Sequence, residues 1–322
     1  MSETSMLRSV PASFFGIVLG LVGLGDCWRF AYKVWGVPQV IGEIVMLIAV
    51  ATWAILVTLY LFKWLTARDN ALAEWRHPVQ SCFIGLGSVA TMLAAVAIGP
   101  YSHTAAVTLF QIGAALDIAY GLFFMGRAWA EPRDHSTTTG ALYLPTVAGN
   151  FVAGFVAGYL GFHDLAVLFF GAGALCWLAI ESVIVHRLVA HDTLPVPLRA
   201  TMGIMLAPPV VGCVAYLFIT SGTPDLVAKA LLGYGLLQLL LLLRLLPWIC
   251  KQPFGAPYWA FSFGVTALAF DSIVFVQRGL TGLFEPLAIV LFVFANIVMA
   301  VLAIGTLALL LRGKLVPMPS KV

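Results

Sequence analysis

The sequence predicts an all-α polytopic membrane protein with ten transmembrane helices, and two observations carry this prediction. First, 61% of the 322 residues are hydrophobic and 10% are charged, with a mean hydropathy of +1.01. Soluble domains average roughly half apolar and a quarter charged residues. Second, charge-free apolar runs recur along the whole chain, and many approach the length of about 20 residues that a spanning helix needs.

These runs assign the helices in order. The run 77–116 is long enough for two spans, and Gly99-Pro100 divides it, while 44–62 and 286–311 each form the centre of one. The connections are short, so consecutive helices are expected to be antiparallel neighbours within one transmembrane domain, 1–322, that has no separate soluble domain. The expected helices are 11–33, 38–65, 77–98, 103–129, 142–161, 164–189, 199–221, 226–249, 256–278 and 284–312.

The basic residues predict the orientation of the chain. If both termini and the loops after the even helices share one side, that side holds thirteen of the 17 basic residues. Such a bias marks the cytoplasmic side, so both termini are expected there. The thirteen are Arg8, Lys63, Arg68, Arg76, Arg127, Arg133, Arg187, Arg199, Arg244, Lys251, Arg312, Lys314 and Lys321, against Arg29, Lys33, Lys229 and Arg278 on the other side.

Prolines reveal an internal repeat. Pro11, Pro78, Pro145 and Pro208 each lie near the start or middle of an odd-numbered helix, and Pro257 opens the ninth. A fixed period indicates repeated supersecondary units, so the chain is expected to form five helical hairpins around a central pore, with kinks at the first four prolines. Chance is the alternative, because membrane helices tolerate proline.

Small residues follow one face of several odd helices, whereas the even helices are bulky all round. One interpretation is that the small faces line a pore; the other is that they allow helix backbones to approach closely. The residues are Ser13, Gly16, Gly20 and Gly23 in the first helix, Ser81, Gly85 and Ser88 in the third, Asn150, Gly154, Ala157 and Gly161 in the fifth, and Ala260, Gly264 and Ala267 in the ninth.

Phe263 stands at the edge of the small face of the ninth helix. It is a large rigid side chain next to Gly264, which has none. If this face borders a narrow passage, the Phe263 ring is the group large enough to close it. The alternative is that Phe263 packs in an ordinary helix interface.

Ionisable residues inside apolar runs are functional candidates, because each costs at least about 2.5–3.5 kcal/mol at mid-membrane. Most lie near predicted helix ends, where their head groups can reach water. Asp117 is the deepest and is expected to play a hydrogen-bonded structural role, with proton relay as the alternative, and Glu181 is a candidate partner of Arg244. The set is Asp26, Glu43, Asp117, Glu181, Arg244 and Asp271.

No enzyme motif or metal-ligand spacing is present, so we expect no catalytic residue, no cofactor and no metal. The net charge of +3 is modest and dispersed, which does not favour a nucleic-acid partner. The expected partners are small inorganic or organic anions and the lipid bilayer.

Seven segments together resemble the tellurite-resistance/dicarboxylate transporter family, which also contains the plant guard-cell slow anion channels. They span nearly the whole chain. They are PASFFGIVLG at 11–20, RHPV at 76–79, LYLPTVAGNF at 142–151, FFGAG at 169–173, RATMGIMLAP at 199–208, LLGYGLLQLLLLLRLLPW at 231–248 and WAFSFG at 259–264.

This resemblance implies a homotrimer in the bacterial inner membrane, in which each subunit has its own pore. It implies a quasi-fivefold arrangement of the hairpins with the odd helices inside, occlusion of the pore by Phe263, and Gly16 in the pore wall. It also implies an anion channel or channel-like anion exporter. The alternative is a secondary transporter of C4-dicarboxylates or tellurium oxyanions, whose binding site would normally need fixed charges at mid-membrane; the odd-helix faces offer only Asn150, Asp271 and hydroxyls.

Overall fold

A computed structural model describes residues 10–132 and 134–315, and it confirms the predicted helices. Ten helical spans are long and apolar enough to cross a membrane, and each begins and ends within three residues of its expected bound. No strand occurs in the described residues. The spans are Ala12–Trp35, Gln39–Thr66, Gln80–Ile98, His103–Ala130, Gly140–Tyr159, His163–Ala190, Val196–Ile219, Leu226–Ile249, Ala256–Gln277 and Phe284–Leu311.

Odd and even spans differ sharply in burial. In the most apolar stretch of each odd span, 67–83% of the residues are buried, against 17–33% in the even spans. The even spans are single long helices whose bulky side chains face outward: α3 (Gln39–Thr66), α6 (His103–Ala130), α8 (His163–Ala190), α10 (Leu226–Ile249) and α12 (Phe284–Leu311). The odd spans are therefore an inner set and the even spans an outer set.

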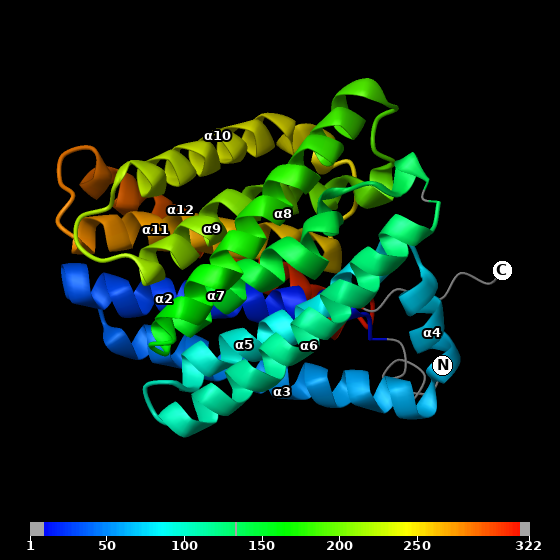
Figure 1. Ribbon diagram of the computed structural model, residues 1–322, viewed down its shortest axis with the longest axis horizontal. Coiled ribbons are helices and arrows are strands. Elements are labelled where there is room, and N and C mark those ends of the chain that lie inside the picture. Colours follow the sequence, from blue (N-terminus) through cyan, green and yellow to red (C-terminus); the bar gives the residue numbers. More distant parts are fainter. Residues whose placement is uncertain (1–9, 133, 316–322) are drawn as a thin grey trace.

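The inner spans form a closed ring. Their α-helices are α2 (Phe15–Trp35), α5 (Leu86–Ile98), α7 (Gly149–Tyr159), α9 (Ala207–Ile219) and α11 (Ser262–Gln277). Each packs against the next, α11 packs back on α2, and each also packs on the outer helix that follows it in the chain. Figure 1 shows the long helices running in the same general direction as one bundle. This arrangement is compatible with five hairpins in fivefold order.

Every inner span begins with an irregular helical segment before its α-helix. Four of the α-helices follow 3₁₀ segments: η1 (Ala12–Phe14), η2 (Gln80–Gly85), η6 (Val196–Leu206) and η7 (Ala256–Phe261). The fifth, α7, follows the 3₁₀ segment η4 (Gly140–Tyr143) and the π-helical segment η5 (Leu144–Ala148).

The prolines lie at these junctions, where a residue without an N–H does the least damage to an α-helix. Pro145 lies inside η5, and Pro208 is the second residue of α9. Pro11 directly precedes η1, and Pro78 lies in the turn before η2.

One helix was not predicted. α4 (Arg68–Arg76) follows α3 and lies across one end of the bundle (Figure 1). Its Glu74 is buried; one carboxylate oxygen accepts a hydrogen bond from the N–H of Ala12 at 2.8 Å, and the other accepts one from Lys63 at 2.6 Å. α4 therefore fixes the start of the first inner span.

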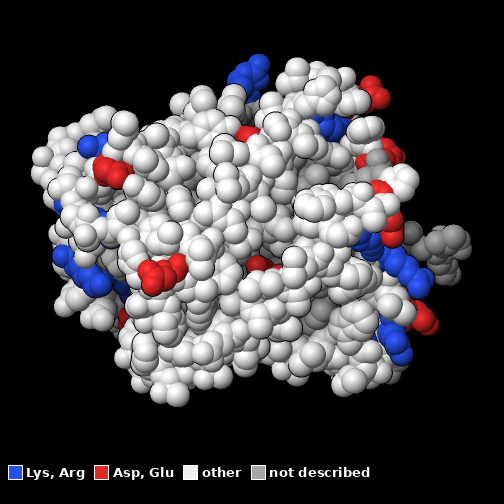
Figure 2. All heavy atoms as spheres, in the orientation of Figure 1, with Lys and Arg blue, Asp and Glu red and all other residues white. Residues whose placement is uncertain are grey.

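The charged side chains lie mainly at the two ends of the bundle and leave a broad band with few charges between them (Figure 2). Such a band is what a bilayer requires of the lipid-facing surface. Arg8, Arg133 and Lys321, which contributed to the predicted orientation, lie outside the described residues.

Candidate functional site

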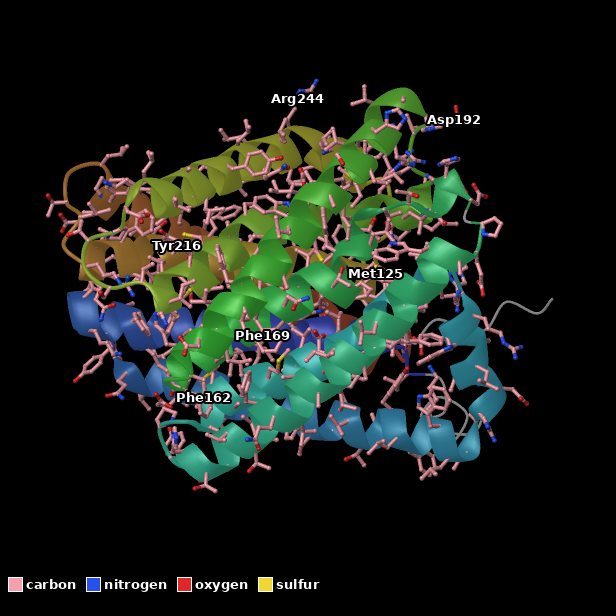
Figure 3. The ribbon with its side chains drawn as sticks, in the orientation of Figure 1. Met125, Phe162, Phe169, Asp192, Tyr216 and Arg244 are labelled. Carbon is pink, nitrogen blue, oxygen red and sulfur yellow. The ribbon has the colours of Figure 1, made fainter. Side chains whose placement is uncertain are left out.

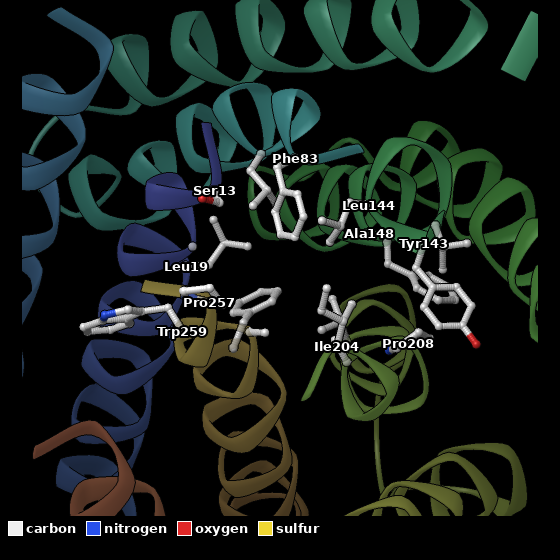
Figure 4. Close-up of a pocket in the computed structure, with 18 of the residues that line it drawn as sticks. Ser13, Leu19, Phe83, Tyr143, Leu144, Ala148, Ile204, Pro208, Pro257 and Trp259 are labelled. Carbon is white, nitrogen blue, oxygen red and sulfur yellow. The ribbon is translucent and has the colours of Figure 1, made fainter. Parts of the chain in front are cut away.

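A cavity of about 50 Å³ lies between the five inner spans, where their irregular segments pass into α-helices. Figure 4 shows side chains from all five spans directed at it. Its walls are almost entirely apolar. They are formed by Ser13, Gly16, Leu19, Phe83, Leu86, Tyr143, Leu144, Val147, Ala148, Phe151, Ile204, Ala207, Pro208, Val211, Ala256, Pro257, Trp259, Ala260 and Phe263.

A second, smaller cavity of about 20 Å³ lies further along the same helices, towards their C-terminal ends. On α2, Gly16 and Leu19 line the first cavity, and Gly23 and Asp26 line the second. This spacing of three and four residues follows one face of a helix, so one face of α2 borders both cavities. The second cavity is lined by Gly23, Asp26, Leu93, Phe155, Val211, Val214, Phe263, Ala267 and Phe270.

Phe263 and Val211 line both cavities. Ala260 at the end of η7 and Phe263 and Ala267 of α11 follow one helical face at a spacing of three and four residues. The Phe263 side chain is partly exposed although its span is largely buried, because it borders these internal spaces. Phe263 is thus part of the wall that the two cavities share, and the two cavities together are called the path below.

The structure places four of the ten residues expected in the pore lining beside this path. Ser13, Gly16 and Ala260 line the first cavity, and Ala267 lines the second. A Cβ atom on Gly16 would lie 3.8 Å from the Cβ of Trp259, which is an ordinary contact.

Two other expected residues lie in tight helix contacts. A Cβ on Gly20 would come within 2.5 Å of the Ser262 Cβ, and one on Gly264 within 3.0 Å of Leu206. Gly20 lets α2 and α11 approach, and Gly264 lets α11 approach the junction of η6 and α9. At these positions the structure shows the close-packing alternative for the small faces.

The remaining four line neither cavity. Gly154 faces α8, where a Cβ would be 3.2 Å from the carbonyl oxygen of Ala166, and Asn150 lies one turn before it and donates to the carbonyl of Thr146 at 2.6 Å. Gly85 faces Tyr120 of α6, and Ser81 is buried.

Large apolar side chains, not small ones, form most of the path. Leu19, Leu86, Phe151 and Val211 belong to this wall, and none was singled out from the sequence. Leucine, valine and phenylalanine occur equally on lipid-facing and core-facing helix surfaces, so their pattern carries no signal that distinguishes a pore wall.

A partly buried hydrogen-bond cluster holds one wall of the first cavity. Glu181 of α8 accepts hydrogen bonds from the hydroxyl of Tyr143, from Trp177 at 2.9 Å and from the hydroxyl of Tyr234 at 2.7 Å. Figure 4 shows the Tyr143 hydroxyl directed away from the labelled wall residues of the cavity. The cluster therefore fixes the Tyr143 ring in the wall.

The hypothesis that Glu181 pairs with Arg244 is wrong, because these three donors already satisfy the carboxylate. No salt bridge joins the two residues within the described chain. Arg244 instead projects from α10 away from the bundle (Figure 3).

Asp117 has the hydrogen-bonded role expected for it. It is buried on α6, accepts a hydrogen bond from Ser88 of α5 at 3.0 Å and lies against Gly149, the first residue of α7. Its carboxyl lines neither cavity, so it joins an outer helix to two inner ones. Among the described residues, no group of three or more histidine, cysteine or acidic side chains is arranged to hold a metal ion.

The first cavity lies where the irregular segments of the inner spans pass into α-helix. The residue before each of the five α-helices is itself in helical conformation, so these junctions are not free helix N-termini and carry no terminal charge of their own. No Lys or Arg is among the residues that line either cavity.

Comparisons with known proteins identify the family of the chain. Residues 9–307 match the family described as voltage-dependent anion channel, SLAC1. A tellurite resistance protein TehA homolog from Haemophilus influenzae is 33% identical over 306 residues, which cover 95% of this chain and 92% of that protein. The S-type anion channels SLAH4 and SLAH1 of Arabidopsis thaliana are 28% and 27% identical and cover 85% and 89% of this chain and 76% and 80% of their own length.

Proposed function

The chain belongs to the voltage-dependent anion channel family, SLAC1, and from this premise we propose that it is an anion channel or channel-like exporter closed by the Phe263 ring. The observation that carries the proposal is that Phe263 lines both cavities of a path enclosed by five inner spans. The family and the absence of acidic side chains among the residues that line the first cavity support anions over cations as the permeant ions.

In the proposed pore, an anion loses most of its water as it enters the first cavity. The Phe263 ring must rotate or yield before the ion reaches the second cavity. Gly16 and Ala260, on the adjacent first and last inner spans, are the small residues that line the first cavity on the side of the ring. We include in the proposed lining Ser13, Gly16, Ala260 and Ala267 together with the large apolar wall residues.

Replacing Phe263 with alanine tests this proposal. We expect Phe263→Ala to raise anion current through the purified protein in planar bilayers on the order of tenfold, because it removes an apolar constriction. Phe261→Ala is the matched control: it makes the same change on the same span, but the Phe261 ring packs against Gly203 and lines a separate groove between α10 and α12.

Three outcomes would count against the proposed gate. Currents that stay unchanged in a folded Phe263→Ala protein would show that Phe263 packs in a helix interface and does not close the path. An equal rise in Phe261→Ala would show that loosening η7, not opening the path, increases current. Slow, saturable flux without channel currents would favour a carrier of dicarboxylates or tellurium oxyanions.

We also propose that the protein forms a homotrimer in the bacterial inner membrane with both termini in the cytoplasm. The family resemblance supports the trimer, and the distribution of basic residues supports the orientation. Light scattering of the detergent-solubilised protein should give the mass of three 34.6 kDa chains plus bound detergent. A monomer mass under conditions that preserve channel activity would remove the trimer from the proposal.

A further inference from the structure

Asp26 is the only residue with a polar side chain among the nine that line the second cavity. It is 7% exposed. The other walls of this space are glycine, alanine, leucine, valine and phenylalanine from all five inner spans. The sequence suggested that Asp26, near a helix end, reaches out to water, but the structure turns it inward, onto the face of α2 that borders the path.

The carboxyl of Asp26 accepts no hydrogen bond from any described residue, although Arg29 lies one turn away. Arg29 is engaged elsewhere: it donates to both carboxylate oxygens of Glu43, at 2.9 and 2.8 Å, and to the backbone carbonyls of Val96 and Ala97. Glu43 thus compensates the positive charge nearest to Asp26, and no side chain competes for the carboxyl.

The other groups around Asp26 offer little compensation. Lys33, two turns along α2, is exposed and lies over the ring of Phe30. Tyr159 of α7 is a titratable side chain that interacts electrostatically with Asp26 but does not line the cavity. α5, α9 and α11 present Leu93, Val214 and Phe270 and other apolar side chains to the cavity. An apolar space accommodates a neutral carboxyl at much lower cost than an ionised one.

We propose that Asp26 is a proton-dependent specificity residue of the anion path. In the neutral form its O–H donates a hydrogen bond to a passing anion and so replaces a lost water molecule. In the ionised form its negative charge stands in the path, repels the anion and attracts a cation. Proton binding at the second cavity therefore decides whether small monovalent anions pass once the Phe263 ring has yielded.

This inference rests on the proposed function, so its test begins from a protein in which the ring has been removed. Nitrate currents through Phe263→Ala should rise on the order of tenfold as the pH falls from about 8 to about 5. The negative charge of ionised Asp26 repels an anion in the second cavity, and protonation of the carboxyl removes this repulsion. In Phe263→Ala/Asp26→Asn the current should be independent of pH and equal to the acid limit of the parent. Asp26→Glu, which restores a titratable group, should restore a pH dependence.

Asp225→Asn is the matched control, because it makes the same chemical change at the end of the bundle nearer the second cavity but outside both cavities. Hydrogen bonds from the Tyr216 hydroxyl and from the N–H of Ala228 hold the pKa of Asp225 below its ordinary value. It therefore stays ionised throughout the pH range of the experiment. Phe263→Ala/Asp225→Asn should keep the full pH dependence.

The outcomes separate the two proposals. If Phe263→Ala conducts anions but Asp26→Asn leaves its pH dependence unchanged, the assignment to Asp26 is overturned and the channel stands. If Phe263→Ala passes no anion current at any pH, both fall. Should Asp26→Asn fail to fold, the reversal potential of Phe263→Ala in a nitrate gradient still decides: it must shift towards cation permeability at high pH, and a constant reversal potential would refute the inference.

Discussion

At the scale of the residue, two aromatic side chains close together in the sequence differ in what their rings contact. Phe261 and Phe263 share a segment and a chemical identity, yet the first packs against Gly203 in a helix contact and the second borders both cavities. The sequence nominated Phe263 through the glycine and alanines beside it. Asp26 was among the ionisable candidates, but the sequence could not place its carboxyl beside the cavities, because an acidic residue near a helix end usually turns towards water.

A residue-scale prediction concerns the buried pair Lys63 and Glu74, whose side chains are 4% and 7% exposed. Lys63→Met leaves Glu74 buried without its cation, which should cost about 3 kcal/mol. The loss should appear as a lower midpoint of thermal unfolding in detergent.

Arg127→Met is the control for Lys63→Met. Arg127 pairs with Glu131 at 3.4 Å, but these side chains are 31% and 64% exposed, so the pair should contribute less than about 1 kcal/mol. Equal midpoints for the two variants would show that α4 does not fix the start of the first span in the way its contacts indicate.

At the scale of the element, the contact between α2 and α11 depends on the absence of side chains. Thr266 lies so close to Gly23 that its Oγ1 would be 2.2 Å from an added Cβ, and Ser262 leaves no more room at Gly20. The Ser262 hydroxyl donates to the carbonyl of Trp259 at 2.7 Å and lies 3.3 Å from that of Gly16. Small polar residues of this kind are typical of tight helix pairs in membranes.

We predict that Gly20→Ala destabilises the protein by about 1–3 kcal/mol, because an added methyl overpacks the contact and pushes α2 and α11 apart. Gly126→Ala on α6 makes the same change where no atom lies within 4 Å of the new Cβ, and alanine there should instead stabilise the helix by up to about 1 kcal/mol. Thermal unfolding measures both. A Gly20→Ala protein as stable as Gly126→Ala would contradict the close approach.

The elements show which features could be predicted from the sequence. Span boundaries were predictable because charge-free runs and prolines mark where lipid and water begin. The lining of the two cavities was only partly predictable: Gly16 and Ala267 line them, but Gly20 and Gly154 serve helix contacts, and both uses demand the same small residues at the same spacing. Helix α4 was missed because it is short and five of its nine residues are charged or polar, so it carries no membrane signal.

At the scale of the whole molecule, the charge distribution predicts weak selectivity. The walls of both cavities contain no Lys or Arg, so no side chain there is strong enough to replace a tightly held hydration shell. The ease of dehydration should then decide the order of permeation.

We therefore expect iodide and nitrate to pass more readily than chloride through Phe263→Ala. Reversal potentials under bi-ionic conditions give the permeability ratios directly, and the Phe261→Ala protein supplies the reference for leak. A higher permeability for chloride than for nitrate would indicate a specific coordinating site instead of an apolar wall without basic side chains.

The ring of inner spans is closed by contact between its first and last members, α2 and α11. During synthesis these two helices leave the ribosome more than two hundred residues apart. Until the fifth hairpin has been inserted, the glycine face of α2 lacks its contact with α11, and the ring of inner spans is open on one side. The fifth hairpin therefore completes the wall. A chain that ends before Phe263 lacks both the last inner span and the residue proposed as the gate, so it cannot enclose the cavities.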